Sequence, residues 1–118
     1  MTILYLDTDA LARVRAMTER ELQAEVRQLC KDRGLLVQHV EDSKAGRVWL
    51  SGFPDLEVIG PGGIIWRELK QQHKSATTEQ LLVGAAIIKA GCSWKTWKPA
   101  DLLAGRIAAE LDLITERT

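Results

Sequence analysis

The sequence predicts a small α/β domain in which a mixed β-sheet is flanked by helices. Three observations support this fold class. Apolar residues recur at helical spacing within residues 18–33. A glycine-rich turn, residues 60–63, separates two short apolar runs, which is typical of a β-hairpin. A second helical segment, a strand and a last helix follow, so the predicted order is α-β-β-β-α-β-α.

The first helix of the domain is predicted to begin at Thr18. Thr18 and Glu21 fit a capping box. Gly34 ends the helix. The next residues, 35–40, are β-like, and the polar residues 41–47 indicate a loop. The apolar positions at helical spacing are Leu22, Val26, Leu29 and Cys30.

The hairpin brings charged residues together. If residues 60–63 form a four-residue turn between strands 55–59 and 64–70, then Asp55 lies opposite Glu68. Directly opposed residues of an antiparallel pair share a face, with Cβ atoms about 5 Å apart. Because Lys70 is two residues beyond Glu68, it shares that face as well.

Four further elements complete the predicted domain. A polar loop, residues 71–76, precedes a helix over residues 77–90. Residues 93–98 are predicted to form a strand, and Pro99 suits the first turn of a last helix that ends near Leu111.

One domain accounts for the 118 residues, which weigh 13.2 kDa. We predict an N-terminal appendage (1–17), the domain itself (18–112) and a C-terminal tail (113–118). The appendage is expected to pack on the domain's edge or at a dimer interface through Ile3, Leu4 and Leu6.

Composition excludes several classes of protein. A hydrophobic fraction of 46% and a charged fraction of 27% are ordinary for globular proteins, which argues against a disordered chain, collagen-like repeats and a coiled coil. Sixteen basic and sixteen acidic residues balance, so phosphate contacts would need a local patch. No apolar run approaches a membrane helix and no signal peptide is evident, which predicts a soluble intracellular protein. The N-terminal third has a basic bias from Arg13, Arg15, Arg20, Arg27, Lys31 and Arg33.

Two opposed carboxylates repel each other unless a positive charge lies between them. Lys70 supplies one charge, and a divalent cation would supply more. Mg²⁺ and Mn²⁺ prefer oxygen ligands and are often held by one or two carboxylates. Asp55, Glu68 and Lys70 therefore suit metal-assisted phosphodiester hydrolysis. The alternative is that Asp55 only begins a strand and that Glu68 and Lys70 form an exposed pair at a sheet edge.

Several short motifs together resemble the VRR-NUC family of the PD-(D/E)xK nuclease superfamily. They are residues 52–56 (GFPDL), residues 67–70 (RELK), Gln80, Gly91 and residues 96–99 (TWKP). The helix start at residues 18–23 (TERELQ) and His39 also resemble the family pattern, and the resemblance spans about residues 18–111. It implies a restriction-endonuclease-like fold.

The resemblance implies roles for individual residues. Asp55 and Glu68 would bind Mg²⁺ or Mn²⁺, with the Leu69 carbonyl as a possible third ligand, and Lys70 would be the catalytic lysine. The remaining implied site residues are Glu19 as the acid of the first helix, Gln23 supporting it, and Gln80 from the second helix. The family's Gly-Arg pair is replaced here by residues 71–74 (QQHK), which leaves His73 and Lys74 as candidate contacts to DNA.

Some assignments stay open. Glu21 and Glu25 compete with Glu19, although Glu21 suits the capping box and Glu25 a solvated face. Gln80 either closes a capping box with Thr77 or belongs to the site, and the two roles are compatible.

His39, Trp94 and Trp97 each have a structural and a functional interpretation. His39 is either structural, which we favour, or a general acid or phosphate contact. Trp94 and Trp97 alternate with Lys95 and Lys98, which fits either base stacking or a half-buried strand. We expect packing for Trp97.

The sequence thus predicts a metal-dependent DNA endonuclease of a bacterial cytoplasm, of phage or mobile-element origin. A homodimer acting on branched or structured DNA, as small Holliday-junction resolvases of the superfamily do, is the expected form. The alternative is a non-catalytic nucleic-acid-binding or assembly module that retains the fold.

Overall fold

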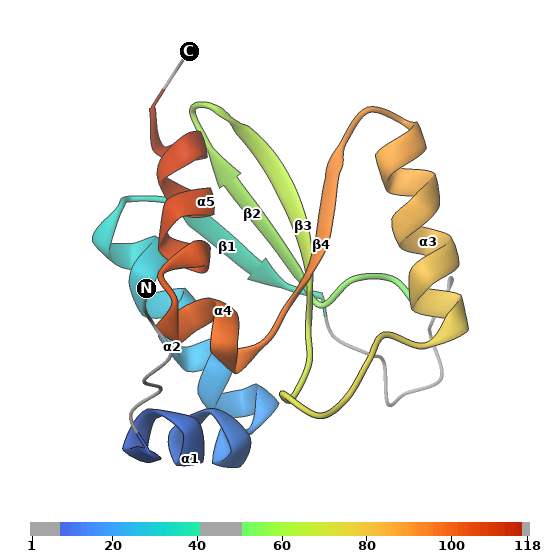
Figure 1. The fold of residues 1–118 in the computed structure, drawn as a ribbon. Helices are drawn as coiled ribbons and strands as arrows, with labels where there is room; N and C mark the ends of the chain where they lie inside the picture. Colours follow the sequence, from blue (N-terminus) through green and yellow to red (C-terminus); the bar gives the residue numbers. More distant parts are fainter. Residues whose placement is uncertain (1–7, 41–50, 117–118) are drawn as a thin grey trace, which may run out of the picture.

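A computed structural model describes residues 8–40 and 51–116 of the chain (Figure 1). The predictions for Ile3, Leu4 and Leu6 and for the loop at 41–47 lie outside the described residues. Among the residues that are described, no helix is long and apolar enough to span a membrane.

The order of elements predicted from Thr18 onward is confirmed as far as the strand before Pro99. The elements are α1 (Thr8–Ala16), α2 (Glu19–Asp32), β1 (Leu36–His39), β2 (Leu56–Gly60), β3 (Gly63–Leu69), α3 (Thr78–Lys89), β4 (Ser93–Trp97), α4 (Pro99–Leu103) and α5 (Arg106–Thr115). Capping boxes begin α2 at Thr18 and α3 at Thr77, as the sequence predicts.

The strands form one mixed sheet in the order β1-β2-β3-β4. β1, β2 and β3 are antiparallel neighbours, whereas β4 runs parallel to β3. Ile59 pairs with Ile64, and Gly60 pairs with Gly63. The predicted hairpin register is therefore confirmed.

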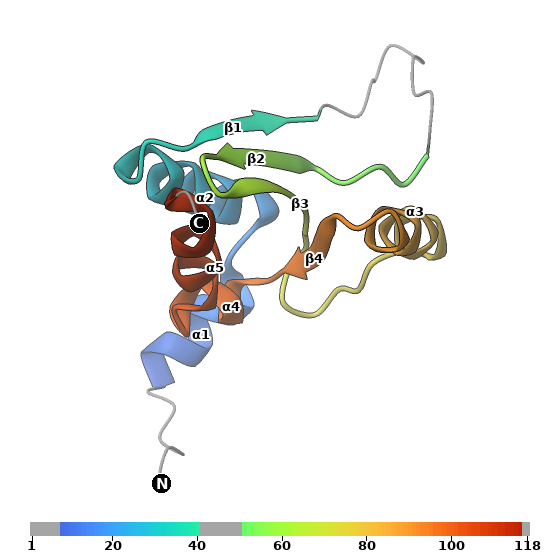
Figure 2. The same cartoon turned by 90° about the horizontal axis from the view of Figure 1, so that it is seen from above.

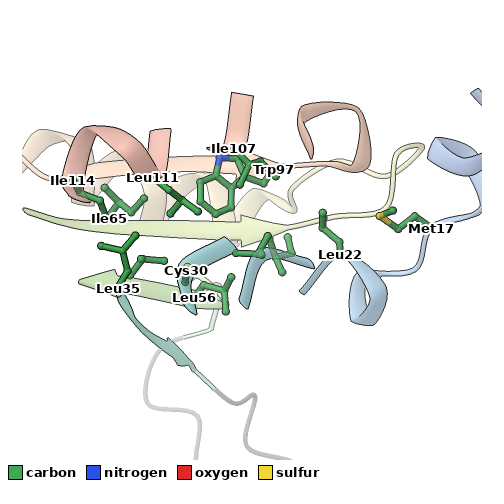
Figure 3. Packing of buried hydrophobic residues seen from close by; sticks show 13 residues of the cluster. Met17, Leu22, Cys30, Leu35, Leu56, Ile65, Trp97, Ile107, Leu111 and Ile114 are labelled. Atoms are coloured by element: carbon green, nitrogen blue, oxygen red, sulfur yellow. The ribbon is translucent and has the colours of Figure 1, made fainter. Parts of the chain in front are cut away.

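Helices cover the two faces of the sheet unequally. α2 and α5 pack on one face, while α3 lies against β4 on the other (Figure 2). The apolar stripe of α2 and that of α5 meet the sheet in the core shown in Figure 3. Leu22 and Leu111 are completely buried there, and burial of such a side chain contributes about 1.5–3 kcal/mol.

The C-terminal helix differs from the prediction. Gly105 has a left-handed φ of 78° and separates α4 from α5, so the single helix expected from Pro99 becomes two. α5 also continues to Thr115, beyond the predicted helix end near Leu111, because Ile114 extends the buried stripe of the helix. At the other end, Val14 and Met17 of the predicted appendage are buried.

Trp97 is a packing residue, as expected. It is 1% exposed, and its Nε1–H donates to Glu110 Oε1 at 3.0 Å. The buried Arg67 guanidinium lies 5.0 Å from the Trp97 ring centre and pairs with Glu110 at 2.9 Å. Trp94 packs on the other side of the sheet, where a Cβ at Gly84 of α3 would collide with its indole ring.

Candidate active site

The segment before β2 positions Asp55 by packing on the start of α3. Gly52 has a φ of +89°, and a Cβ there would lie 2.5 Å from the Glu79 carbonyl carbon, so only glycine allows this approach. Phe53 meets Trp66 of β3 edge to face at 5.4 Å between ring centres. Asp55 is thereby held at the start of β2.

Asp55 bridges the ends of two strands. Its Oδ2 accepts a hydrogen bond from the Leu69 backbone N–H at 2.9 Å. Its own carbonyl accepts from the Val40 N–H at 2.6 Å, just after β1. Continuing the β2–β3 register by one pair beyond Leu56–Arg67 places Asp55 opposite Glu68, as the sequence predicts.

Glu68 is a buried carboxyl beside another acid. The residue is 1% exposed, and burial together with the hydrogen-bonded, negatively charged Asp55 raises the pKa of Glu68 to about 9. Lys70, whose Nζ lies 4.0 Å from Glu68 Oε2, opposes this shift, whereas Glu19 adds to it. Within the described part of the chain, Glu68 Oε1 has no hydrogen-bond partner.

Gln80 closes the capping box of α3 and also contacts the Glu68 side chain. Its Oε1 accepts from the Thr77 N–H at 2.8 Å, which completes the capping box of α3. Its Nε2 donates to Glu68 Oε2 at 2.8 Å. The first turn of α3 therefore fixes the orientation of the buried carboxyl.

An open pocket of about 550 Å³ lies between α2 and these strand ends. Its wall includes Glu19 and Gln23 of α2. Glu21 instead closes the capping box with Thr18. Glu25 is not among the lining residues. The pocket-lining residues are Glu19, Arg20, Gln23, Ala24, Arg27, His39, Asp55 and Leu69.

Arg20 and Arg27 were predicted only as part of a general basic bias, and the structure places both at the pocket. Their seven-residue separation on α2 puts them on one helix face, with Gln23 between them. The spacing was visible in the sequence, but which face of α2 turned toward the acids was not.

The structure does not bring His73 and Lys74 to the pocket wall. Both side chains are exposed in the segment after β3. The neighbouring Gln72 accepts a hydrogen bond from the Ala100 N–H at 3.0 Å, which ties this segment to the start of α4.

The acidic side chains suit a divalent cation with few protein ligands. In residues 8–40 and 51–116 no group of three or more His, Cys, Asp or Glu side chains is clustered for metal binding. Asp55 and Glu68 offer two carboxylates, and the unpartnered Glu68 oxygen offers a lone pair. Mg²⁺ and Mn²⁺ fit such a site because they commonly keep several waters.

Comparison with known proteins shows a fold likeness. A solved structure described as "VRR_NUC domain" matches with a TM-score of 0.61 and 26% identity, covering 77% of this chain and 96% of the other. Another, "VRR_NUC domain protein", has a TM-score of 0.59 and 23% identity, covering 86% and 98%. No family model matches, and no curated protein does.

We predict that Glu68→Gln stabilises the metal-free protein. The folded-state pKa of Glu68 lies above its unfolded value, so the contribution of Glu68 to stability is greatest at acidic pH and is lost as the pH rises toward about 9. The glutamine keeps an oxygen for Gln80 but carries no charge. Urea unfolding in EDTA should show a gain on the order of 1–2 kcal/mol at pH 8 and a smaller gain at pH 5.

Glu57→Gln, on the adjacent strand β2, is the matched control and should change stability little. A Glu68→Gln variant that is less stable than wild type throughout this pH range would refute the electrostatic account.

Proposed function

We propose that this chain, which has the fold of the VRR-NUC domain, is a divalent-metal-dependent DNA endonuclease. The observation that carries the proposal is the adjacent pair of carboxyls, Asp55 and Glu68, with an unpartnered Glu68 oxygen and Lys70 Nζ at 4.0 Å. A fold that needed no charge at this position would gain stability from neutral residues. The presence of the pair, of which Asp55 lines the open pocket, favours a catalytic role.

Asp55, Glu68 and the backbone carbonyl of Leu69 would hold Mg²⁺ or Mn²⁺. When bound, such an ion stabilises charge on phosphate and lowers the pKa of a water molecule. Gln80 keeps the Glu68 carboxyl aimed at this position through its 2.8 Å hydrogen bond.

Lys70 and the α2 residues act around that centre. The Lys70 ammonium lies close enough to the acids to orient a scissile phosphate or a water by charge and hydrogen bonding. Glu19 faces the same pocket from α2 and can accept a proton or a hydrogen bond from water. Gln23, one turn further along, supports it, and His39 forms part of the β1 wall.

Arg20 and Arg27 supply the local positive patch that a neutral chain needs in order to bind DNA. Both are exposed, and neither forms an ion pair within the described ranges. Seven residues of helix separate them by about 10 Å along its axis. They are therefore able to contact different phosphates of one strand that passes the carboxyl pair.

The proposed substrate is branched or structured DNA, and the proposed form is a homodimer in the cytoplasm of a bacterial cell, with a phage or mobile-element origin. A single domain of this size covers little duplex. Two copies would present two pockets and a wider surface, which suits a junction with two strands to cut.

We predict that substitutions of the acids and of the lysine have different effects on metal binding. Asp55→Asn and Glu68→Gln should abolish cleavage and weaken Mn²⁺ binding, because each removes a ligand. Lys70→Ala should abolish cleavage while Mn²⁺ binding persists or tightens, because a positive charge beside the site is lost. Calorimetry measures the affinity of each variant for Mn²⁺. Cleavage rates are measured on labelled duplex, flap, splayed and four-way-junction DNAs. We expect cleavage to be fastest on the junction and to be lost in EDTA.

Near-normal cleavage by Lys70→Ala would show that the lysine is an ordinary strand residue. Tight DNA binding by wild type with no cleavage of any substrate in Mn²⁺ would favour the non-catalytic binding module.

We also predict that Arg20→Ala and Arg27→Ala weaken substrate binding more than turnover. Each should raise KM at least about 3-fold with kcat nearly unchanged, and reduce the slope of log affinity against log salt by about 1. Arg106→Ala is the control, because Arg106 is also exposed but pairs with Asp101 and does not line the pocket. Equal effects in all three variants would mean that the pocket arginines have no special place on the DNA path.

A further inference from the structure

Lys98 lies directly after β4, where it continues the pairing of β4 with β3. The parallel register ends with Leu69 beside Trp97, and the Lys70 N–H donates to the Trp97 carbonyl at 3.0 Å. Lys98 itself is still extended, with a φ of −126° and a ψ of 164°. One further step of the register therefore places Lys98 beside Lys70, at the spacing of neighbouring strands, about 5 Å.

The two lysines share the face of the sheet that carries Glu68. Side chains alternate along a strand, so Lys98 lies on the same side of β4 as Trp94 and on the opposite side from the buried Trp97. Trp94 packs against α3, and the first turn of α3 also reaches Glu68. Lys70 points the same way, because its Nζ lies 4.0 Å from Glu68 Oε2. Lys98 thus borders the proposed catalytic centre from the side of β4.

A second hydrogen bond holds the ends of β3 and β4 together. Gln72 Oε1, beyond β3, accepts from the N–H of Ala100, two residues after Lys98, at 3.0 Å. This bond and the backbone bond from Lys70 to Trp97 fix the two lysines relative to each other from both sides. Lys98 is also half-buried. Its position is therefore restrained before any ligand binds, which lowers the entropy cost of a contact.

The Lys98 ammonium has no acidic partner among the residues that the structure describes. The acid nearest to it in sequence, Asp101, is already engaged. Its Oδ2 accepts from the Lys98 backbone N–H at 2.8 Å, and its Oδ1 pairs with Arg106 at 2.8 Å. Lys95 differs, because it lies on the opposite face of β4 and pairs with Glu110 at 3.4 Å. The structure thus distinguishes two lysines that look alike in the sequence.

A restrained cation without a protein partner, beside a nuclease centre, suits a phosphate of the substrate. Lys and Arg contacts to phosphates fix the position of a DNA strand on a protein. Arg20 and Arg27 line the pocket from α2, with His39 of β1 and Asp55 of β2 in the same wall. Lys98 lies outside that wall, on the other side of β3. A strand that crosses from α2 to β4 therefore meets positive charge on both sides of the acids.

We propose that Lys98 is a second phosphate-binding lysine of the site, which holds the DNA strand on the β4 side at a phosphate adjacent to the scissile one. This inference rests on the proposed function and adds a substrate-binding residue to it. Lys70 and Lys98 have different tasks. Lys70 approaches Glu68 and acts at the scissile phosphate, whereas Lys98 forms no such pair and contributes to binding.

The test is fluorescence anisotropy of a labelled four-way-junction DNA in EDTA, which measures binding without cleavage. Lys98→Met keeps the apolar stem of the side chain and removes its charge. It should raise Kd at least about 3-fold and reduce the slope of log affinity against log salt by about 1. Lys98→Arg keeps the charge and should bind within about 2-fold of wild type. Lys95→Met is the matched control on the same strand and should leave Kd and slope unchanged.

Turnover in Mn²⁺ separates binding from chemistry. Lys98→Met should raise KM while kcat stays within about 2-fold of wild type, whereas Lys70→Ala should lose kcat. Circular dichroism checks that each variant folds. A Lys98→Met variant with the Kd and salt slope of wild type overturns the proposal. An equal loss of affinity in Lys95→Met also overturns it, as does a fall in kcat at unchanged KM.

The two proposals fail in different ways. If wild type cuts DNA and Lys98→Met binds and cuts equally well, the Lys98 contact is refuted and the nuclease stands. If wild type binds DNA through Lys98 but cuts no substrate in Mn²⁺, the contact stands and the nuclease is refuted.

Discussion

The structure depends on the constraint that two carboxyls, Asp55 and Glu68, lie side by side where β2 begins and β3 ends. The hairpin register sets them opposite each other, and the Leu69 N–H fixes Asp55 by a 2.9 Å hydrogen bond. Gly52 lets the preceding segment approach α3, whose first turn supplies Gln80 to Glu68. Burial and the neighbouring negative charge oppose ionisation of Glu68, so an ionised Glu68 lowers the free energy of unfolding.

Local sequence signals were sufficient for most of this arrangement. Residues 60–63 determined the turn and hence the pairing of the strands, and alternation along each strand then placed Asp55, Glu68 and Lys70 on one face. Capping boxes marked the starts of α2 and α3. These signals act over a few residues, which is why they can be read without the tertiary structure.

What the sequence left undecided depends on how helices pack. Glu19, Glu21 and Glu25 all stay candidates until the rotation of α2 against the sheet is known, and of these three only Glu19 lines the pocket. The same rotation brings Arg20 and Arg27 to it. His73 and Lys74 are near Lys70 in sequence, but the segment after β3 turns toward α4, so nearness along the chain did not predict a place at the pocket. The break at Gly105 was missed because a single glycine within an apolar helical pattern is often tolerated.

α3 connects the carboxyl pair to the packing of the sheet. Its first turn orients Glu68 and its inner face packs on Trp94, while its outer face is apolar and exposed. These two contacts restrict the residues that α3 can carry at Gln80 and Gly84. Close packing on Trp94 accounts for Gly84 better than helix propensity does.

The central claim is that the Asp55–Glu68 pair is unfavourable alone and favourable with a divalent cation. Thermal unfolding of wild type and Glu68→Gln, each in EDTA and in millimolar Mn²⁺ near pH 8, tests it most directly. The account predicts that the variant melts at the higher temperature in EDTA, and that Mn²⁺ raises the melting temperature of wild type well beyond its effect on the variant. If Mn²⁺ shifts both proteins equally, or neither, the pair is not a metal site and the account is contradicted.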